Sequence, residues 1–144
     1  MHSDGIEIGP LDYPLRLPRE ARVRYVNYLD GPGLREAYSS TLREGRPLVT
    51  PDVVDDGARL ASFADASLDF VVANHMLEHV EDLIVALKHQ LRVLKPSGIL
   101  YLTLPDARYT FDAPRNEPQW STYCAIVARV QKYRAASTMR NAHG

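Results

Sequence analysis

The stretch that decides the fold is "LDFVVANHMLEHVEDLIVALKHQLRVLKPSGILYLTLP", residues 68–105. It begins and ends with short apolar runs, "LDFVVA" at 68–73 and "ILYLTL" at 99–104, which are typical of strands buried on both faces. Between the two runs, six apolar residues recur at helical spacing: Val80, Leu83, Ile84, Leu87, Leu91 and Leu94. Pro96 and Gly98 follow this segment and end it. A strand, a helix and a second, parallel strand are therefore predicted.

Upstream of this stretch, the same alternation of elements continues. Short runs of β-forming residues predict strands at 5–8, 22–29 and 51–54, and residues 34–44 predict a helix. The prolines at positions 14 and 18 predict a loop between the first two strands. Strands that alternate with helices indicate an α/β fold, a Rossmann-like doubly wound and mostly parallel sheet of about five strands.

The composition excludes several classes of protein. The chain has 144 residues, is 45% hydrophobic and carries a net charge of −1, so it can form a core and has no global field that attracts nucleic acid. The longest apolar runs are far shorter than the ~20 residues of a membrane-spanning helix. Cys124 is the single cysteine, which fits a reducing compartment. We expect a cytoplasmic protein without a membrane partner, and no nucleic-acid partner.

One motif inside the deciding stretch suggests a different chemistry. His75 to His79, "HMLEH", has the H-x-x-E-H spelling of a zinc-hydrolase motif. Zinc would require His75 and His79 one turn apart on a continuous helix, together with a third ligand. The motif instead begins at a strand end, and the periodic helix starts only around Val80 to Asp82. A zinc hydrolase through His75, Glu78 and His79 is the least favoured alternative, and we expect no metal site and a solvated Glu78.

Polar residues and glycines gather at the predicted strand ends, whereas the strands themselves are apolar. In open α/β sheets, ligands bind outside the carboxyl ends of the strands. The residues at these ends are Gly9-Pro10, Asn27, Asp56-Gly57, Asn74-His75 and Pro105-Asp106. This pattern predicts a binding edge.

The order of these motifs resembles a known family. Residues 62–105 are similar to the middle of a class I S-adenosylmethionine-dependent methyltransferase, with "LDFV" opening the fourth strand, "LEH" before the helix and "RVLKPSG" before the fifth strand. The acid that the family has after its third strand corresponds to Asp56, just before this stretch. "EIGP" at 7–10 resembles the first motif of the family. The second glycine of that motif is replaced here by Leu11.

The resemblance implies a cofactor, S-adenosylmethionine, and a set of residues that bind it. The implied residues are Glu7, Gly9, Asn27, Asp56, Gly57, Asn74 and His75. Gly9 would meet the methionine part, Asn27 or Asp30 the ribose, Asp56 the adenine, and Asn74 with His75 the sulfonium. Glu7 has the alternative role of capping nearby backbone amides, and His75 is the candidate catalytic residue.

The resemblance also implies an activity, methyl transfer to an unidentified acceptor such as a small molecule. The alternative is a methyltransferase-like binding or scaffold domain that has lost turnover. We predict a cofactor-binding domain over 1–115 that lacks the family's usual last two strands, followed by a basic amphipathic helical extension over 116–144. An uncharged strand at 99–104 would leave a sheet edge that needs cover, so we also predict a homodimer.

Overall fold

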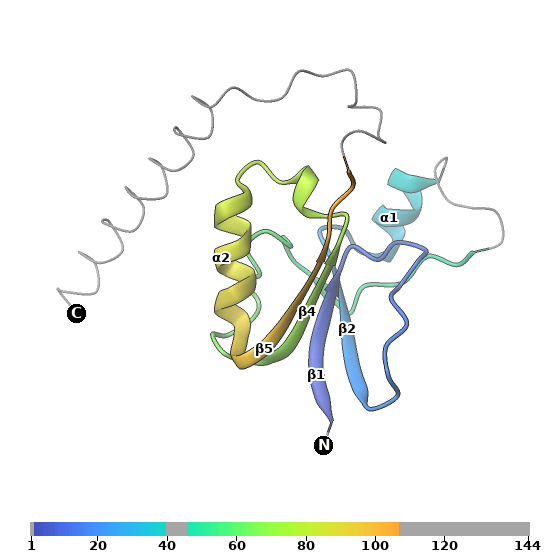
Figure 1. Cartoon of the computed structure of the whole chain (residues 1–144). Coiled ribbons are helices and arrows are strands. Elements are labelled where there is room, and N and C mark those ends of the chain that lie inside the picture. Colours follow the sequence, from blue (N-terminus) through green and yellow to red (C-terminus); the bar gives the residue numbers. More distant parts are fainter. Residues whose placement is uncertain (1, 40–45, 107–144) are drawn as a thin grey trace. The chain divides into compact units, whose positions relative to one another are not determined.

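The computed structural model describes residues 2–39 and 46–106 of the chain (Figure 1). Five strands form one parallel sheet in the order β3-β2-β1-β4-β5. The strands are β1 Ser3–Ile8, β2 Ala21–Asn27, β3 Val53–Val54, β4 Leu68–Asn74 and β5 Leu94–Thr103. The helices are α1 Gly31–Tyr38, the short 3-10 helix η1 Leu77–His79, and α2 Leu83–Val93. The predicted doubly wound α/β fold is confirmed, and its strand order reverses between β1 and β4.

Both α-helices begin at an aspartate that caps them. Asp30 accepts a hydrogen bond from the backbone N–H of Gly33 (2.8 Å), so α1 starts three residues before the predicted helix. Asp82 accepts from the amides of Ile84 and Val85 at 3.1 and 3.0 Å. The α2 helix therefore starts directly after Asp82, at the end of the range Val80 to Asp82 that was predicted for its start.

The start of β5 corrects the sequence prediction. The strand was expected at 99–104, but pairing with β4 already begins at Leu94, which lies opposite Leu68. Ile99 is the next residue in register, opposite Phe70, so residues 95–98 bulge where β4 has only Asp69. Because proline has no amide hydrogen to donate, a bulge is one of the few places where a strand accepts Pro96.

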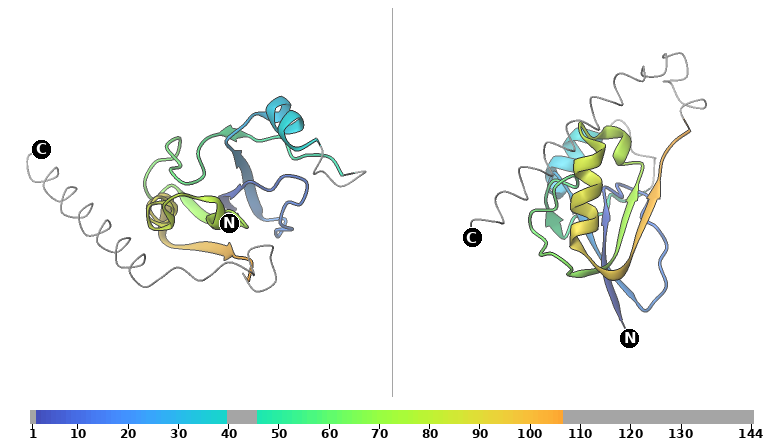
Figure 2. Two further views of the ribbon diagram at one scale, coloured as in Figure 1. Left: turned by 90° about the horizontal axis from the view of Figure 1, so that it is seen from above. Right: turned by 60° about the vertical axis from the view of Figure 1, so that its left-hand side comes forward.

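The main core lies on one face of the sheet, where α2 and the segment between β3 and β4 cover the strands (Figure 2). Alternate residues of the strands point into it, including the fully buried Ile6, Val26 and Val71. Leu60 and Val93 close the core from the covering segments. On the opposite face, Gly5 leaves room for the Phe70 ring, since a β-carbon at Gly5 would overlap that ring.

Some sequence predictions lie outside the described residues. They are the end of the helix predicted over 34–44, the domain boundary at 115, and the helical extension over 116–144. Within the part that the structure describes, no helix has the length and hydropathy needed to cross a membrane.

Candidate functional site

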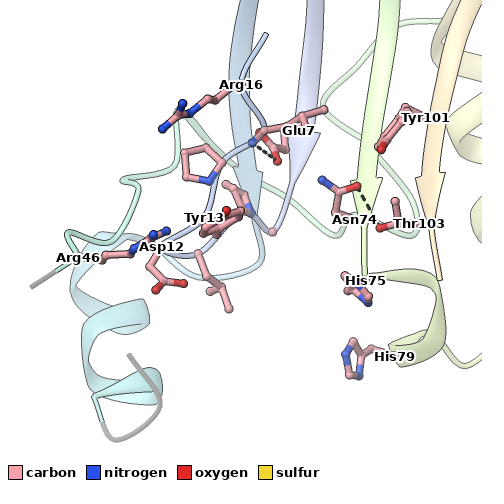
Figure 3. A pocket seen from close by; sticks show the side chains of 15 residues that line it. Glu7, Asp12, Tyr13, Arg16, Arg46, Asn74, His75, His79, Tyr101 and Thr103 are labelled. Atoms are coloured by element: carbon pink, nitrogen blue, oxygen red, sulfur yellow. Dashed lines mark hydrogen bonds between the residues drawn. The ribbon is translucent and has the colours of Figure 1, made fainter. Parts of the chain in front are cut away.

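Two adjoining pockets lie at the carboxyl ends of the strands, where the sheet order reverses. The smaller pocket, of about 540 Å³, is lined by six of the seven residues that the sequence implied: Gly9, Asn27, Asp56, Gly57, Asn74 and His75. The larger pocket, of about 950 Å³, contains the seventh, Glu7 (Figure 3). Gly9, Leu11, Asn74, His75 and His79 line both pockets. Both volumes fall in the range of ~300–1,000 Å³ that is usual for small-molecule sites.

The turn after β1 has two residues in left-handed backbone conformations. Gly9 has φ +63°, and a β-carbon built on it would have no atom within 4 Å, so the backbone there borders open space. Leu11 has φ 49°, which is unfavourable for a residue with a side chain. The chain therefore keeps a conformation suited to glycine at the position where the family's second glycine is absent. The Leu11 side chain stands where the two pockets meet.

Asn27, at the end of β2, is buried, and its side-chain oxygen accepts from the backbone N–H of Tyr28 (2.9 Å). This bond leaves the amide nitrogen of Asn27 as a donor and the second lone pair of its oxygen as an acceptor. Asp30, the other residue considered for this role, caps α1 and lines neither pocket.

Asp56 lies in the turn after β3 with an exposed carboxylate. One of its oxygens accepts from the backbone N–H of Ala58 (2.9 Å), which fixes the turn. The other oxygen lies 3.6 Å from the Nε of Arg59, in an ion pair between two exposed side chains. Such a pair contributes little stability and leaves the carboxylate available to a ligand.

Glu7 has the backbone-capping geometry considered above. Both of its carboxylate oxygens accept from the backbone N–H of Leu15, at 3.0 and 3.1 Å (Figure 3). Burial raises the pKa of Glu7, and the hydrogen bond from Leu15 opposes this shift. The pair fastens the proline-containing loop over the end of β1, which forms one wall of the larger pocket.

Asn74 has a side-chain orientation fixed by the neighbouring strand. The hydroxyl of Thr103 donates to the side-chain oxygen of Asn74 (3.1 Å), so this oxygen faces β5. The amide nitrogen consequently points away from Thr103, on the side of Glu7 (Figure 3). Asn74 thus presents hydrogen-bond donors where the two pockets meet.

The H-x-x-E-H residues form a turn, and no continuous helix runs through them. β4 ends at Asn74, His75 has φ 48°, and only Leu77–His79 form a single 3-10 turn. Glu78 is an exposed residue, as expected, but its side chain is only 23% exposed and its Oε1 lies 3.2 Å from the Nδ1 of His75. Across residues 2–39 and 46–106, no group of three histidine, cysteine or acidic side chains is placed to hold a metal ion.

Several residues that line the pockets were not predicted from the sequence. Asp12 has a buried carboxylate oxygen, Oδ2, that has no hydrogen-bond partner in the described ranges. Arg46 stacks over the ring of Tyr13, with its guanidinium carbon 4.6 Å from the ring centre. Tyr28 and Tyr38 share a hydrogen bond between their hydroxyls (3.0 Å) at the side of the smaller pocket. All five lie in loops or at element ends, where no periodic pattern marks them.

Comparison with known proteins identifies the family. The model of the family described as "Methyltransferase domain" matches residues 30–102, which is 73 of the 144 residues and more than half of the chain. The chain belongs to this methyltransferase-domain family. Its five-stranded sheet is the Rossmann-like fold expected for a class I methyltransferase. A search of curated proteins found no match.

Among solved structures, the chain is similar to an S-adenosylmethionine-dependent methyltransferase from Thermotoga maritima, described as a possible histamine N-methyltransferase. The identity is 23% and the TM-score 0.52, over 77% of this chain and 48% of that one. It also matches the trans-methyltransferase CalH in complex with SAH (18%, TM-score 0.49, 74% and 34%). A third match is a methyltransferase from Methanococcus maripaludis (16%, TM-score 0.47, 70% and 47%). The Thermotoga likeness supports the fold alone, and the chain spans about half of that protein's length.

Proposed function

We propose that this chain binds S-adenosylmethionine at the carboxyl ends of its strands and transfers the methyl group to an unidentified acceptor. One observation carries the proposal. Six residues at the carboxyl ends of β2 and β4 and in the turns after β1, β3 and β4, far apart in the sequence, line a single pocket of about 540 Å³. They are the residues that the family resemblance implied for the cofactor. The proposed cofactor would lie across both pockets, with its adenosine in the smaller one.

Two features of the turn after β1 suit the methionine part of this cofactor. The open space beside Gly9 lets a ligand approach the backbone closely. Asp12 lines the larger pocket beside this turn, and its carboxylate is a suitable acceptor for a charged donor such as the cofactor's ammonium group. At the other end, Asp56 would accept from the adenine amino group, and Asn27 would bond a ribose hydroxyl.

The cofactor supplies the reactive methyl group on a cationic sulfonium, which is already a good leaving group. The protein's contribution is then mainly to hold the acceptor in line with that methyl group. Asn74 and His75, which border both pockets, are the side chains that would lie closest to the reacting atoms.

The alternative, binding without turnover, is favoured by one observation. Leu11, which lines both pockets, stands where the family has a glycine, so its bulk would both weaken binding and displace a bound cofactor from the position that the reaction needs. Cofactor binding alone would not distinguish the two functions, so both binding and product formation must be measured.

Isothermal titration calorimetry with three ligands tests the proposal. We expect S-adenosylmethionine and S-adenosylhomocysteine to bind, and 5′-methylthioadenosine, which lacks the amino-acid part, to bind more weakly. Asp12→Asn should lower the affinity for S-adenosylhomocysteine about tenfold or more, since a hydrogen bond to a charged group is worth ~1.5–3 kcal/mol. The same substitution should leave the affinity for 5′-methylthioadenosine unchanged. Folded protein that gives no heat with any of the three at millimolar concentration would contradict the proposal.

A further inference from the structure

The H-x-x-E-H residues contain a side-chain pair, His75 and Glu78, of which Glu78 has no part in the proposed cofactor site. Nδ1 of His75 lies 3.2 Å from Oε1 of Glu78. A carboxylate can only accept a hydrogen bond, so a small turn of the ring would let this contact become a hydrogen bond if the proton of the neutral imidazole is on Nδ1. The second ring nitrogen, Nε2, then keeps a free electron pair and can accept a proton.

The backbone holds both members of this pair. His75 has φ 48°, and its N–H donates to the carbonyl of Thr103 in β5 (3.1 Å). A left-handed conformation costs a non-glycine residue ~1–2 kcal/mol, and backbone strain of this kind clusters at functional sites. Glu78 belongs to the 3-10 turn, which is anchored by the buried Leu77. The pair therefore depends on a fixed turn, unlike most ion pairs between flexible surface side chains.

The position of the pair distinguishes the roles of its members. His75 lines both pockets and its side chain is 62% exposed. Glu78 lines neither pocket, and its side chain is 23% exposed. The imidazole is thus the member that can meet a ligand, and the carboxylate lies behind it.

We propose that His75 is the general base of the methyl transfer and that Glu78 is its positioning residue. This inference rests on the proposed function. An electron pair on the acceptor's oxygen or nitrogen forms a bond to the methyl carbon, the carbon–sulfur bond breaks, and its electrons remain on sulfur. The acceptor's proton passes to Nε2 of His75. The acceptor is therefore a neutral O–H or N–H group, because an acceptor that is already anionic has no proton to lose.

The tautomer of His75 tests the pair in the full chain without any ligand. Long-range 1H–15N correlation NMR at pH 8 shows which ring nitrogen carries the proton. Signals of His75 are assigned with His75→Asn, because asparagine tolerates the left-handed backbone. We expect the proton on Nδ1 in the wild-type protein. In Glu78→Ala the proton should move towards Nε2, whereas Glu78→Gln, which keeps an acceptor oxygen, should preserve the wild-type form.

Glu81→Ala is the matched control, since Glu81 is an exposed acid in the same connection and makes no hydrogen bond or ion pair with any described residue. It should leave the tautomer unchanged. Two results would show that Glu78 does not position the His75 ring. One is a proton on Nε2 in the wild-type protein, and the other is a proton that stays on Nδ1 in Glu78→Ala.

Adding S-adenosylhomocysteine to the same samples tests the place of the ring in the reaction. We expect the His75 ring signals to shift, because His75 borders the proposed position of the sulfur. If calorimetry shows binding and the ring signals do not move, His75 is not at the reacting centre and the base assignment is wrong. If S-adenosylhomocysteine does not bind at all, the proposed function is wrong, and the assignment of His75 as the base is wrong with it. The tautomer measured without ligand still shows whether Glu78 orients the His75 ring.

Discussion

Gly57 lies directly against Ile8, so that a β-carbon added at Gly57 would overlap the Cγ2 atom of Ile8. Ile8 is a buried residue at the end of β1, and Gly57 belongs to the turn after β3. The close approach places the turn that carries Asp56 beside the end of β1. The smaller pocket, which both residues line, therefore keeps its shape only because glycine has no side chain at position 57.

Gly57→Ala should destabilise the fold and weaken cofactor binding. Forcing an extra methyl group into a packed site typically costs ~1–3 kcal/mol. Chemical denaturation measures the free energy of unfolding, and calorimetry with S-adenosylhomocysteine measures binding. In an Ile8→Ala background the nearest contact is gone and only the flexible end of Met76 must move, so the cost of Gly57→Ala should shrink. Additive effects of the two substitutions would contradict this contact as the cause.

Asp56→Ala should reduce the affinity for S-adenosylhomocysteine several-fold, because one hydrogen bond to a neutral partner is worth ~1 kcal/mol. Asp56→Asn keeps an oxygen for the Ala58 amide and so preserves the turn, which separates loss of the ligand contact from loss of the turn. Glu78→Ala is the comparison, since Glu78 lines neither pocket. Equal affinities for Asp56→Ala and Glu78→Ala would contradict the placement of adenine beside Asp56.

Leu11→Gly should increase the affinity for S-adenosylhomocysteine. The substitution removes the side chain at the junction of the two pockets and suits the left-handed backbone at this position. Leu11→Asn is the control, because asparagine also tolerates this conformation but retains a side chain of considerable size. Calorimetry should show tighter binding for the glycine variant only. Tighter binding by both variants would mean that the strained backbone at position 11, and not the bulk of the Leu11 side chain, limits the affinity.

Glu7→Gln should alter the dependence of stability on pH. Burial raises the pKa of Glu7 above its ordinary value of 4.5. A carboxyl with a raised pKa in the folded state contributes most stability below pH 4.5, and this contribution is lost as the pH rises through the folded-state pKa. Glutamine keeps an acceptor for the Leu15 amide and never ionises, so the variant should gain stability relative to wild type as the pH rises above 4.5.

Urea denaturation of wild type and Glu7→Gln over a pH series measures this difference. Glu20→Gln, at an exposed acid, serves as the control and should follow the wild-type curve. Parallel curves for Glu7→Gln and wild type would show that Glu7 ionises without loss of stability.

The homodimer predicted from the sequence stays a prediction. β5 is the last strand in the sheet order, and Ile99 and Tyr101 on it are 65% and 44% exposed. If two copies join through this strand, Ile99→Lys should convert the dimer to a monomer in light scattering at tens of micromolar. Leu91→Lys, at an exposed apolar residue on α2, should leave the dimer intact. A wild-type monomer under these conditions would exclude the association.

The sequence determined the elements whose patterns are local. A buried strand or an amphipathic helix needs apolar residues at fixed spacing, so the sequence of such a segment is enough to predict it. This holds for the apolar run 68–73, the helical repeat that follows it and the run 99–104. The parallel order of strands then placed Asn27, Asp56 and Asn74 at one edge of the sheet. Six of the seven implied residues could accordingly be found from their positions after strands.

Tertiary structure alone decided how these side chains are used. Leu15, which takes up both oxygens of Glu7, lies in a loop without periodicity. The pairing of His75 with Glu78 required a strained turn in place of the helix that the H-x-x-E-H spelling suggests. Side-chain contacts of this kind depend on a few torsion angles, which packing against β5 and the loops sets. No pattern of residue types along the chain encodes those angles, and for that reason the chemistry of the site emerged only from the folded structure.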